Sequence, residues 1–549
     1  MALKLMLATA LLGGAGWTYL GQDAWSRASF VQAAAVLLLA QVFVVHGIWS
    51  TFVYPFWFSP LRHLPTAPGG HWLLGHGKKI LAAKPAVLFR EWALNMPNDG
   101  LIRYYWLLNH ERLLITSPKA LAEVLVTNNY AFQKPENVRS MLGRVLGYGV
   151  LLAEGDEHKR QRRNLMPAFA FRHIKDLYPV FWDKAREVVQ AMTTECGKLG
   201  EAEFEAGEWA SRVTLDIIGV AGLGRDFHAI QDDNSDIVQT YKFLFKPRPP
   251  AKLLVFLATL VPTWWLQRLP LERNRAIDEA AQTIKSVCRD LIREKREKMM
   301  TNKGRTDVDI LSVAMESGQF TDENLVDQLM TFLAAGHETT STALTWAIYE
   351  LSRSPEMQTR LRNEIREKLP STDDAEAKIT SLDIDHMPYL NAVCNEVLRF
   401  FSPVPLTIRE AAYDTTIQGV PVKKGTRLTI SPFAVNVNPR LWGSDASQFN
   451  PDRWVSAEGA ADESNKRAAS GGAESNYAFL SFLHGPRSCI GMGFAKGEFA
   501  CLLAAWIGRF EFELVNKEEA DLDKIDIRGG VTAKPANGLY VKAKVVPGY

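Results

Sequence analysis

The most informative part of this sequence is the run Phe482-Leu483-His484-Gly485-Pro486-Arg487-Ser488-Cys489-Ile490-Gly491. Its glycines and proline predict a tight loop, and an apolar helical pattern follows it to Ile507. A cysteine just before a helix lies near the positive end of the helix dipole, and this position favours the thiolate. Thiolates are soft metal ligands, so the loop predicts a metal site at Cys489. The alternative for a single cysteine is a small buried apolar side chain.

The same run resembles the haem-binding loop of the cytochrome P450 family, Phe-x-x-Gly-x-Arg-x-Cys-x-Gly. All five specified positions match, at Phe482, Gly485, Arg487, Cys489 and Gly491. The resemblance implies a haem b cofactor with Cys489 as the axial iron ligand. It also implies a mainly α fold with small peripheral β-sheets. Further motifs of that family follow in order over roughly residues 60 to 549.

Length and composition limit the other possibilities. The chain has 549 residues, a net charge of +2 and five cysteines without paired spacing. The near-neutral charge gives no support to nucleic-acid binding, and the cysteines favour a reducing compartment over a disulfide framework. Length alone suggests about three or four domains. The resemblance instead implies one haem-thiolate catalytic domain over residues 77–549.

The N-terminus predicts a membrane anchor. Val31 to Trp49 is a run of 19 residues without a formal charge, about long enough to cross a bilayer. An earlier apolar run, Leu5 to Leu20, is read as a second span, a signal-like segment or an interfacial piece. We therefore expect membrane segments over residues 1–59 and a proline-rich hinge over residues 60–76. Basic residues after the span favour a cytosolic catalytic domain on the endoplasmic reticulum membrane.

The longest helical pattern runs from Thr321 to Arg353, with acidic residues in its first turn. Its middle, Ala334-Ala335-Gly336-His337-Glu338-Thr339-Thr340-Ser341, contains poor helix formers. A solvent-facing polar patch is one interpretation, and the Thr339 hydroxyl can bond back to the carbonyl of Ala335 and locally loosen the helix. The segment is similar to the family's oxygen-binding motif. The resemblance implies that Ala335 and Gly336 leave room for oxygen, Thr339 donates a hydrogen bond to it, and Glu338 supplies protons.

Two further segments are candidates for binding the haem propionates. His158 and Arg162 are four residues apart and share a helix face. The family has Trp-x-x-x-Arg here, so His158 is a departure from its pattern. Arg409 stands where the family often places a second propionate-binding arginine. The segment Gly155–Phe169 also carries Lys159, Arg160 and Arg163. These cations would face outward, toward an acidic electron-donating partner.

A structural lock is predicted from Glu396, Arg399 and Arg453. Glu396 and Arg399 lie three apart on the predicted helix Pro388–Phe400, and Arg453 belongs to the later run Pro451-Asp452-Arg453-Trp454. An exposed ion pair is the simple alternative. The family's Glu-x-x-Arg and Pro-x-Arg motifs imply that two arginines clamp one carboxylate and fix the loop that holds Cys489.

Three shorter patterns predict strands and loops. Residues 101–106 and 112–116 predict a β-hairpin around Asn109-His110, followed by a helix capped by Ser117. Residues 415–417 and 427–430 are expected to pair with each other. Val455 to Asn476 is read as a flexible surface loop.

The resemblance implies a monooxygenase acting on a lipophilic small molecule. A fungal secondary-metabolite intermediate is the first expectation, and a fatty acid or xenobiotic is the alternative. No flavin- or NADPH-binding module follows Cys489, so electrons are expected from an NADPH–cytochrome P450 reductase, with cytochrome b5 as a further candidate. The alternative functions are those of haem-thiolate isomerases, peroxide lyases and a non-catalytic haem-binding membrane protein, and the Glu338-Thr339 pair argues against all three.

The apolar run Leu253–Leu260, with Trp264 and Trp265, predicts either a membrane-dipping entrance or a core helix.

Overall fold

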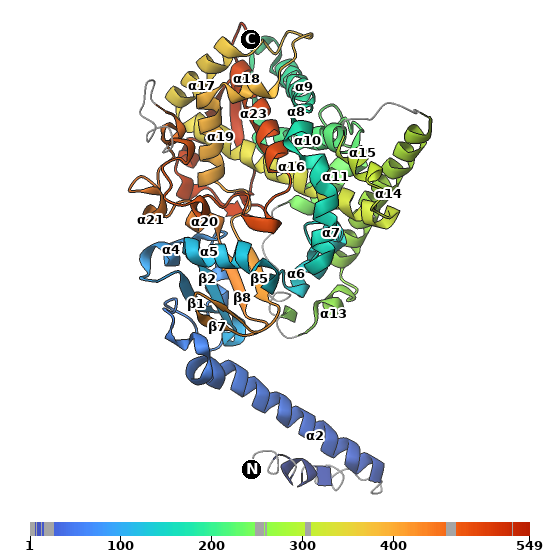
Figure 1. The fold of residues 1–549 in the computed structure, drawn as a ribbon, viewed down its shortest axis with the longest axis vertical. Helices are drawn as coiled ribbons and strands as arrows, with labels where there is room; N and C mark the ends of the chain where they lie inside the picture. Colours follow the sequence, from blue (N-terminus) through green and yellow to red (C-terminus); the bar gives the residue numbers. More distant parts are fainter. Residues whose placement is uncertain are drawn as a thin grey trace.

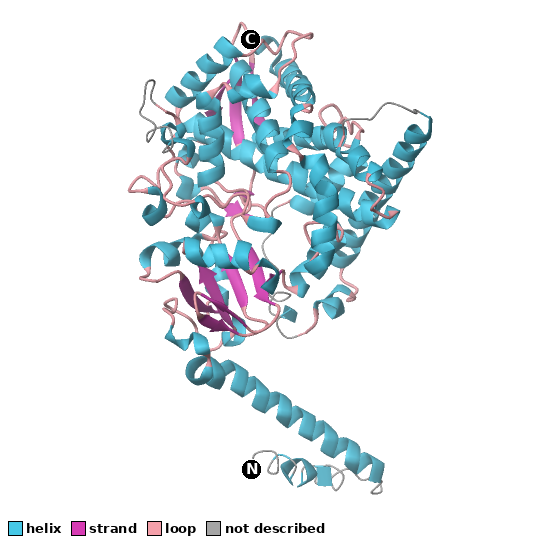
Figure 2. Cartoon of the chain, in the orientation of Figure 1, coloured by secondary structure: helices cyan, strands magenta, loops and turns pink. Residues whose placement is uncertain are grey.

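The structure of the protein is a computed structural model. It describes residues 6, 8–12, 14–15, 27–246, 257–258, 261–301, 309–456, 468–529 and 531–549. Helices make up most of the globular body, and an N-terminal helix extends away from it (Figures 1 and 2). The larger helices are α2 (Arg27–Ile48), α4 (Val87–Asn95), α6 (Glu136–Leu146), α7 (Gly155–Leu165), α9 (Tyr178–Cys196), α10 (Ala206–Ile217), α11 (Asp236–Phe245), α14 (Glu272–Thr301), α16 (Asp322–Arg353), α17 (Pro355–Lys368), α19 (Pro388–Phe400) and α23 (Met492–Arg509).

Shorter helices fill the connections between these. They are α3 (Gly77–Ala82), α5 (Pro118–Ala122), α8 (Phe171–Lys175), α13 (Thr263–Gln267), α15 (Ile310–Glu316), α18 (Ser381–Asp385), α20 (Pro432–Val435) and α21 (Pro439–Trp442). The cap expected at Ser117 is present, and Thr321 caps α16 in the same way. The Ser117 side chain accepts a hydrogen bond from the Ala120 amide, and the Thr321 side chain accepts one from the Asn324 amide.

The strands form one five-stranded sheet and three smaller ones. The large sheet has the order β1-β2-β8-β5-β3, and β4-β12-β9, β10-β11 and β6-β7 form the others. The strands are β1 (Leu101–Tyr105), β2 (Glu111–Ile115), β3 (Phe132–Gln133), β4 (Glu201–Glu205), β5 (Thr407–Ala411), β6 (Thr415–Ile417), β7 (Val420–Val422), β8 (Arg427–Ile430), β9 (Phe510–Leu514), β10 (Ile527–Arg528), β11 (Lys534–Pro535) and β12 (Tyr540–Val545). The antiparallel β1–β2 pair confirms the predicted hairpin.

The predicted pairing of residues 415–417 with 427–430 is wrong. β6 pairs instead with β7, and Ile417 lies opposite Val420. The two residues between them, Gln418 and Gly419, both have positive φ, of 50° and 79°. That backbone closes a two-residue hairpin turn, which brings the chain back at once. β8 lies in the large sheet between β2 and β5.

One large hydrophobic cluster forms the core, and α9, α10, α16, α19 and α23 contribute most of it. α16 crosses the centre of the body, where it packs on α10, α14 and α23 (Figure 1). At about 1.5 Å per residue, its 32 residues extend about 48 Å. Two smaller clusters lie on opposite faces of the large sheet, with Leu113 in one and Leu114 in the other. The long central helix predicted from the sequence is therefore the element that the body is built around.

Three predicted segments lie partly or wholly outside the described residues. Residues 457–467 of the expected surface loop are not described, nor are most of residues 253–260 or much of the apolar run at 5–20. In α13, Trp264 and Trp265 are both exposed. Among the described helices, the one spanning Phe30–Phe58 is long and apolar enough to cross a membrane, and its most apolar window is not buried.

Candidate functional site

Cys489 is an accessible thiol in a rigid loop. The other four cysteines, at 196, 288, 394 and 501, are buried, whereas Cys489 is exposed. Its amide donates a hydrogen bond to the carbonyl of Phe482, 2.8 Å away, which closes the loop three residues before α23 begins. The structure therefore places this thiol at a helix start, as predicted, and leaves it accessible to a ligand.

The position before a helix was expected to lower the pKa of the Cys489 thiol, but in the structure this pKa is raised. Protein atoms surround the side chain closely enough that desolvation raises its pKa, although the Gly491 amide and the Arg162 cation act to lower it. The helix-start setting alone therefore does not produce a thiolate. A coordinated metal cation would, because it deprotonates a bound thiol outright.

The two glycines of the loop serve different purposes. Gly485 has φ +76°, and a Cβ there would lie 2.1 Å from the carbonyl oxygen of Leu125. Only glycine fits that position. At Gly491 a Cβ would meet nothing closer than the Phe169 ring, at 3.8 Å. Gly491 thus leaves open space beside Cys489, as a flat cofactor requires.

α16 presents one accessible strip in the middle of the body. From Gln328 to Leu351 every residue is buried except Ala335, Gly336 and Thr339, which are partly accessible. These positions lie on one side of the helix, because residues four apart are neighbours. The Thr339 hydroxyl donates to the carbonyl of Ala335 at 2.9 Å, as predicted. The predicted solvent-facing patch is therefore not observed, and the accessible strip coincides with the predicted oxygen-binding residues.

A glycine at position 336 is required by packing between α16 and the segment after α10. A Cβ at this position would lie 2.8 Å from the side chain of Ile218. The glycine therefore allows the segment after α10 to approach α16 closely. Ala335 and Gly336 both remain partly accessible on the strip.

Glu338 does not face solvent itself. It is 3% exposed, and its carboxylate accepts a hydrogen bond from Thr532 at 2.7 Å and pairs with the Lys534 ammonium at 2.9 Å. The Lys534 side chain is 27% exposed. The connection from Glu338 to water therefore runs through Lys534, which the sequence analysis missed because nearly 200 residues separate the two.

The segment holding Lys534 is fixed against α16. The Trp346 indole donates to the carbonyl of Ala533 at 2.9 Å, and the Ala533 amide donates to the carbonyl of Pro403 at 3.0 Å. These bonds hold Lys534 at a defined place beside Glu338.

A cluster of basic side chains lies near the Cys489 loop. It comprises Lys134, His158, Arg162, Arg409 and Arg487. Within the described part of the chain, Glu154 pairs with this cluster, through an ion pair with Arg487. Burial, together with Arg487, lowers the pKa of Arg409 to about 10. Burial and the Arg409 cation hold the pKa of Lys134 well below its usual range. Buried positive charge in this excess fits a ligand that carries carboxylates.

The predicted propionate contacts have distinct partners within the protein. Burial lowers the pKa of His158 to about 4, with Arg487 adding to the effect, and its Nδ1 lies 3.0 Å from the Tyr130 hydroxyl. Arg162 donates to the carbonyl of Ser488 at 2.5 Å. Arg409 donates to the Thr407 hydroxyl at 2.8 Å. Arg162 thus steadies the residue before Cys489, a role that the sequence did not indicate.

The predicted lock is present and larger than expected. Arg399 binds Glu396 through two bonds, Nε to Oε2 at 2.8 Å and Nη2 to Oε1 at 2.7 Å, and neither side chain is exposed. Arg453 adds a contact to Glu396 at 3.2 Å. The Asn450 amide and the Trp454 indole also donate to this carboxylate.

Asn436 connects the lock to the cysteine loop. Arg399 donates to the carbonyl of Asn436 at 2.8 Å, and the Asn436 side chain donates to the carbonyl of Arg399 at 3.0 Å. The same side chain binds the Leu480 amide and the Ser481 hydroxyl, both at 2.8 Å. The lock therefore reaches the start of the loop through one asparagine.

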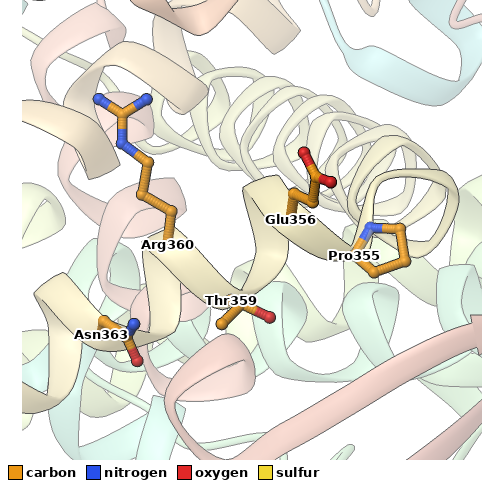
Figure 3. Close-up of a pocket in the computed structure, with 5 residues that line it drawn as sticks. All are labelled: Pro355, Glu356, Thr359, Arg360 and Asn363. Atoms are coloured by element: carbon orange, nitrogen blue, oxygen red, sulfur yellow. The ribbon is translucent and has the colours of Figure 1, made fainter.

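A pocket on the surface of α17 is separate from this site (Figure 3). It is lined by Pro355, Glu356, Thr359, Arg360 and Asn363. None of these residues belongs to the predicted site.

Comparison with known proteins gives the family directly. The family model described as Cytochrome P450 matches residues 65–541. The chain is 47% identical over 523 residues to the cytochrome P450 monooxygenase sphH of Aspergillus fumigatus, covering 94% of each protein. It is 44% identical to the cytochrome P450 monooxygenase FUM15 of Gibberella moniliformis over 98% of each, and 43% identical to ALT8 of Alternaria alternata over 91% and 92%. The family uses haem with cysteine-thiolate ligation of the iron, which the accessible thiol, the open position at Gly491 and the excess of buried cations all fit. This chain belongs to the cytochrome P450 family and is an oxygenase-type oxidoreductase.

Proposed function

We propose that this monooxygenase hydroxylates or epoxidises a lipophilic small molecule, an intermediate of fungal secondary metabolism, with Cys489 as the iron ligand. The observations that support the proposal are the accessible Cys489 thiol and the accessible strip on α16. The similarity to monooxygenases of three fungi supports a fungal substrate.

The residues that would hold the cofactor come from four segments. Phe482, Gly485, Arg487 and Gly491 shape the loop around Cys489. Arg409 and Arg487 would bind propionates as cations, and His158 would do so as a neutral donor because its pKa is lowered to about 4. Lys134 lies in the same cluster and extends the predicted set.

Bound haem supplies the activation of O2, and its thiolate ligand favours cleavage of the O–O bond. The protein has to place the substrate, limit water and deliver protons. Thr339 holds its hydroxyl on the accessible strip, and that hydroxyl is available once its bond to Ala335 is exchanged for one to a ligand. Glu338 lies about 100° further around the helix, within reach of the partly exposed Lys534. Protons would pass from solvent past Lys534 to Glu338 and then, over a bridging water, to Thr339.

Electrons are proposed to come from a separate NADPH–cytochrome P450 reductase, with cytochrome b5 as a second donor. The apolar helix Phe30–Phe58 supports an anchor in the endoplasmic reticulum membrane, with the catalytic body in the cytosol. Protease added to sealed microsomes should then digest the catalytic body. Full protection of the body would contradict this orientation.

Turnover with a reductase tests the function. Metabolite profiles of cells with and without the gene would identify the substrate, and purified protein would then be assayed with reductase, NADPH and that substrate. We expect Thr339→Ala to bind substrate normally but to release more hydrogen peroxide and less product for each NADPH consumed. Thr345→Ala is the matched control, because Thr345 makes the same kind of bond, to Ser341, but is buried. Fully coupled turnover by Thr339→Ala would contradict the proton-delivery role.

A further inference from the structure

We propose that the helical segment Trp49–Phe58, together with the sheet edge that holds it, forms a rigid joint seated in the interfacial layer of a bilayer. This joint would fix how the catalytic body lies on the membrane. The inference rests on the proposed membrane anchoring and adds to it a defined contact surface. Figure 1 shows the joint's position between α2 and the β1–β2 end of the large sheet.

The length of the apolar helix places the joint at the membrane surface. Phe30–Phe58 has 29 residues. About 20 residues cross the hydrocarbon core of a bilayer. If the core begins near Phe30, it ends near Trp49, and the next turns of helix lie among the lipid headgroups.

The exposed side chains of the joint, together with Trp72, which packs on Phe52 of the joint, suit that layer. Trp57 and Trp72 are 62% and 67% exposed, and Trp49, Phe56 and Phe58 are exposed as well. So many large aromatic side chains facing water are unfavourable in a soluble protein. Tryptophan is enriched at membrane–water interfaces, where its ring meets the acyl chains and its N–H reaches polar groups.

The joint is bound to the sheet through backbone carbonyls. The segment Trp49–Phe58 is a π-helix that contains Pro55, and the carbonyl of Thr51 lies in its first turn. The Asn109 side chain donates to that carbonyl at 3.1 Å and to the carbonyl of Trp72 at 2.7 Å. Asn109 itself is 1% exposed. One buried amide thus ties the anchor to two parts of the catalytic body.

Further contacts make the connection stiff. Arg103 donates to the carbonyl of Pro55 at 3.2 Å and pairs with Glu111 at 3.2 Å, with both side chains nearly buried. The Phe56 and Tyr105 rings lie 5.3 Å apart. These contacts cross directly from the anchor to β1.

A groove opens beside the same aromatic side chains. It has a volume of about 660 Å³ and is lined mainly by rings, with a few polar groups among them. Phe52, whose ring stacks on Trp72 with centroids 5.8 Å apart, forms part of its wall. The upper part of a phospholipid acyl chain, with its ester group, matches this mixed lining, so the bilayer is the occupant we assign.

Quenching by brominated lipids tests the seating. The full-length holoenzyme would be placed in phosphatidylcholine nanodiscs whose acyl chains carry bromine either near the headgroup or near the bilayer centre. We expect Trp57→Phe and Trp72→Phe each to lower the quenching by the shallow bromines more than that by the deep ones. Trp209→Phe, at a buried position in the body, is the control. Quenching that both joint variants leave unchanged overturns the proposal.

Hydrogen exchange tests the stiffness. In the same nanodiscs, Asn109→Ala should speed the exchange of amides in residues 49–58 about tenfold, because one buried hydrogen-bonding group is lost. Asn98→Ala, in the same part of the body, is the control and should leave these amides unchanged. Unchanged exchange in Asn109→Ala would show that no rigid joint exists. A full-length chain that does not float with phosphatidylcholine vesicles overturns the anchoring, whereas a chain that floats but fails both tests overturns only the joint.

Discussion

At the residue scale, Lys534 is the clearest addition to the site. Its ammonium is the partly exposed partner of the buried Glu338 carboxylate. Lys534→Gln would leave that carboxylate with the Thr532 hydroxyl alone, and we expect slower turnover with a larger solvent isotope effect. The thermodynamic cost should be about 1–3 kcal/mol.

Two further variants show whether Lys534 positions Glu338 for proton transfer or only stabilises the fold. Lys534→Arg keeps the positive charge and should restore the isotope effect toward that of the wild type. Lys544→Gln removes an exposed lysine from the nearby strand β12 and should leave turnover as it was. If Lys534→Gln loses stability but turns over with an unaltered isotope effect, Lys534 is only a structural partner.

Glu498, on α23, is a second residue whose effect can be measured, through the dependence of the protein's stability on pH. It is fully buried, and burial raises its pKa well above the usual value, while the Thr340 hydroxyl offsets only part of this. Below about pH 4.3 the carboxyl is neutral in both folded and unfolded chains. Above that pH the unfolded chain releases the proton and the folded chain keeps it, so stability falls as pH rises.

In Glu498→Gln, this loss of folding stability with rising pH should disappear. The free energy of unfolding should shift in favour of the variant by about 1.4 kcal/mol for each pH unit, up to the pH at which the folded carboxyl ionises. Denaturant titrations between pH 5 and 8 would measure it, with Glu376→Gln at an exposed position as the control. A difference that does not vary with pH would contradict a neutral Glu498.

At the element scale, the lock joins α19 to the segment around Arg453 and, through Asn436, to the cysteine loop. Glu396→Ala leaves two buried arginines without their carboxylate, which should cost about 3–5 kcal/mol and reduce haem retention. Asp452→Ala is the matched control in the same short segment, because its ion pair with Arg360 is about half exposed and should cost at most about 1 kcal/mol. A Glu396→Ala protein that unfolds and retains haem like the wild type would refute the lock.

The elements also show what a sequence can and cannot predict here. The helices around Thr321 and Pro388 were predicted because caps, prolines and apolar periodicity are local signals. The pairing of β6 was not, because Gln418 and Gly419 form a turn tight enough to override the more distant partner.

The residues of the site also divide into those that the sequence predicted and those that it did not. Its motif residues were found through the resemblance of their segments to motifs of the family. Lys534, Asn436 and Lys134 were missed because they meet the site only through long-range packing, which local patterns do not encode.

At the scale of the whole molecule, one long helix crosses the body with its single accessible strip near the middle, and a second apolar helix leaves the body at the opposite side of the large sheet (Figure 1). The body can therefore be built around a cofactor while its anchor stays outside. That arrangement depends on Cys489 being the iron ligand.

The direct test of that central claim is the carbon monoxide difference spectrum of the reduced protein. The wild type should show the strongly red-shifted band of a thiolate-ligated haem. Cys489→Ser should lose this band, while Cys501→Ser, which alters a buried cysteine on α23, should keep it. A Cys489→Ser protein that still shows the thiolate band would contradict the account.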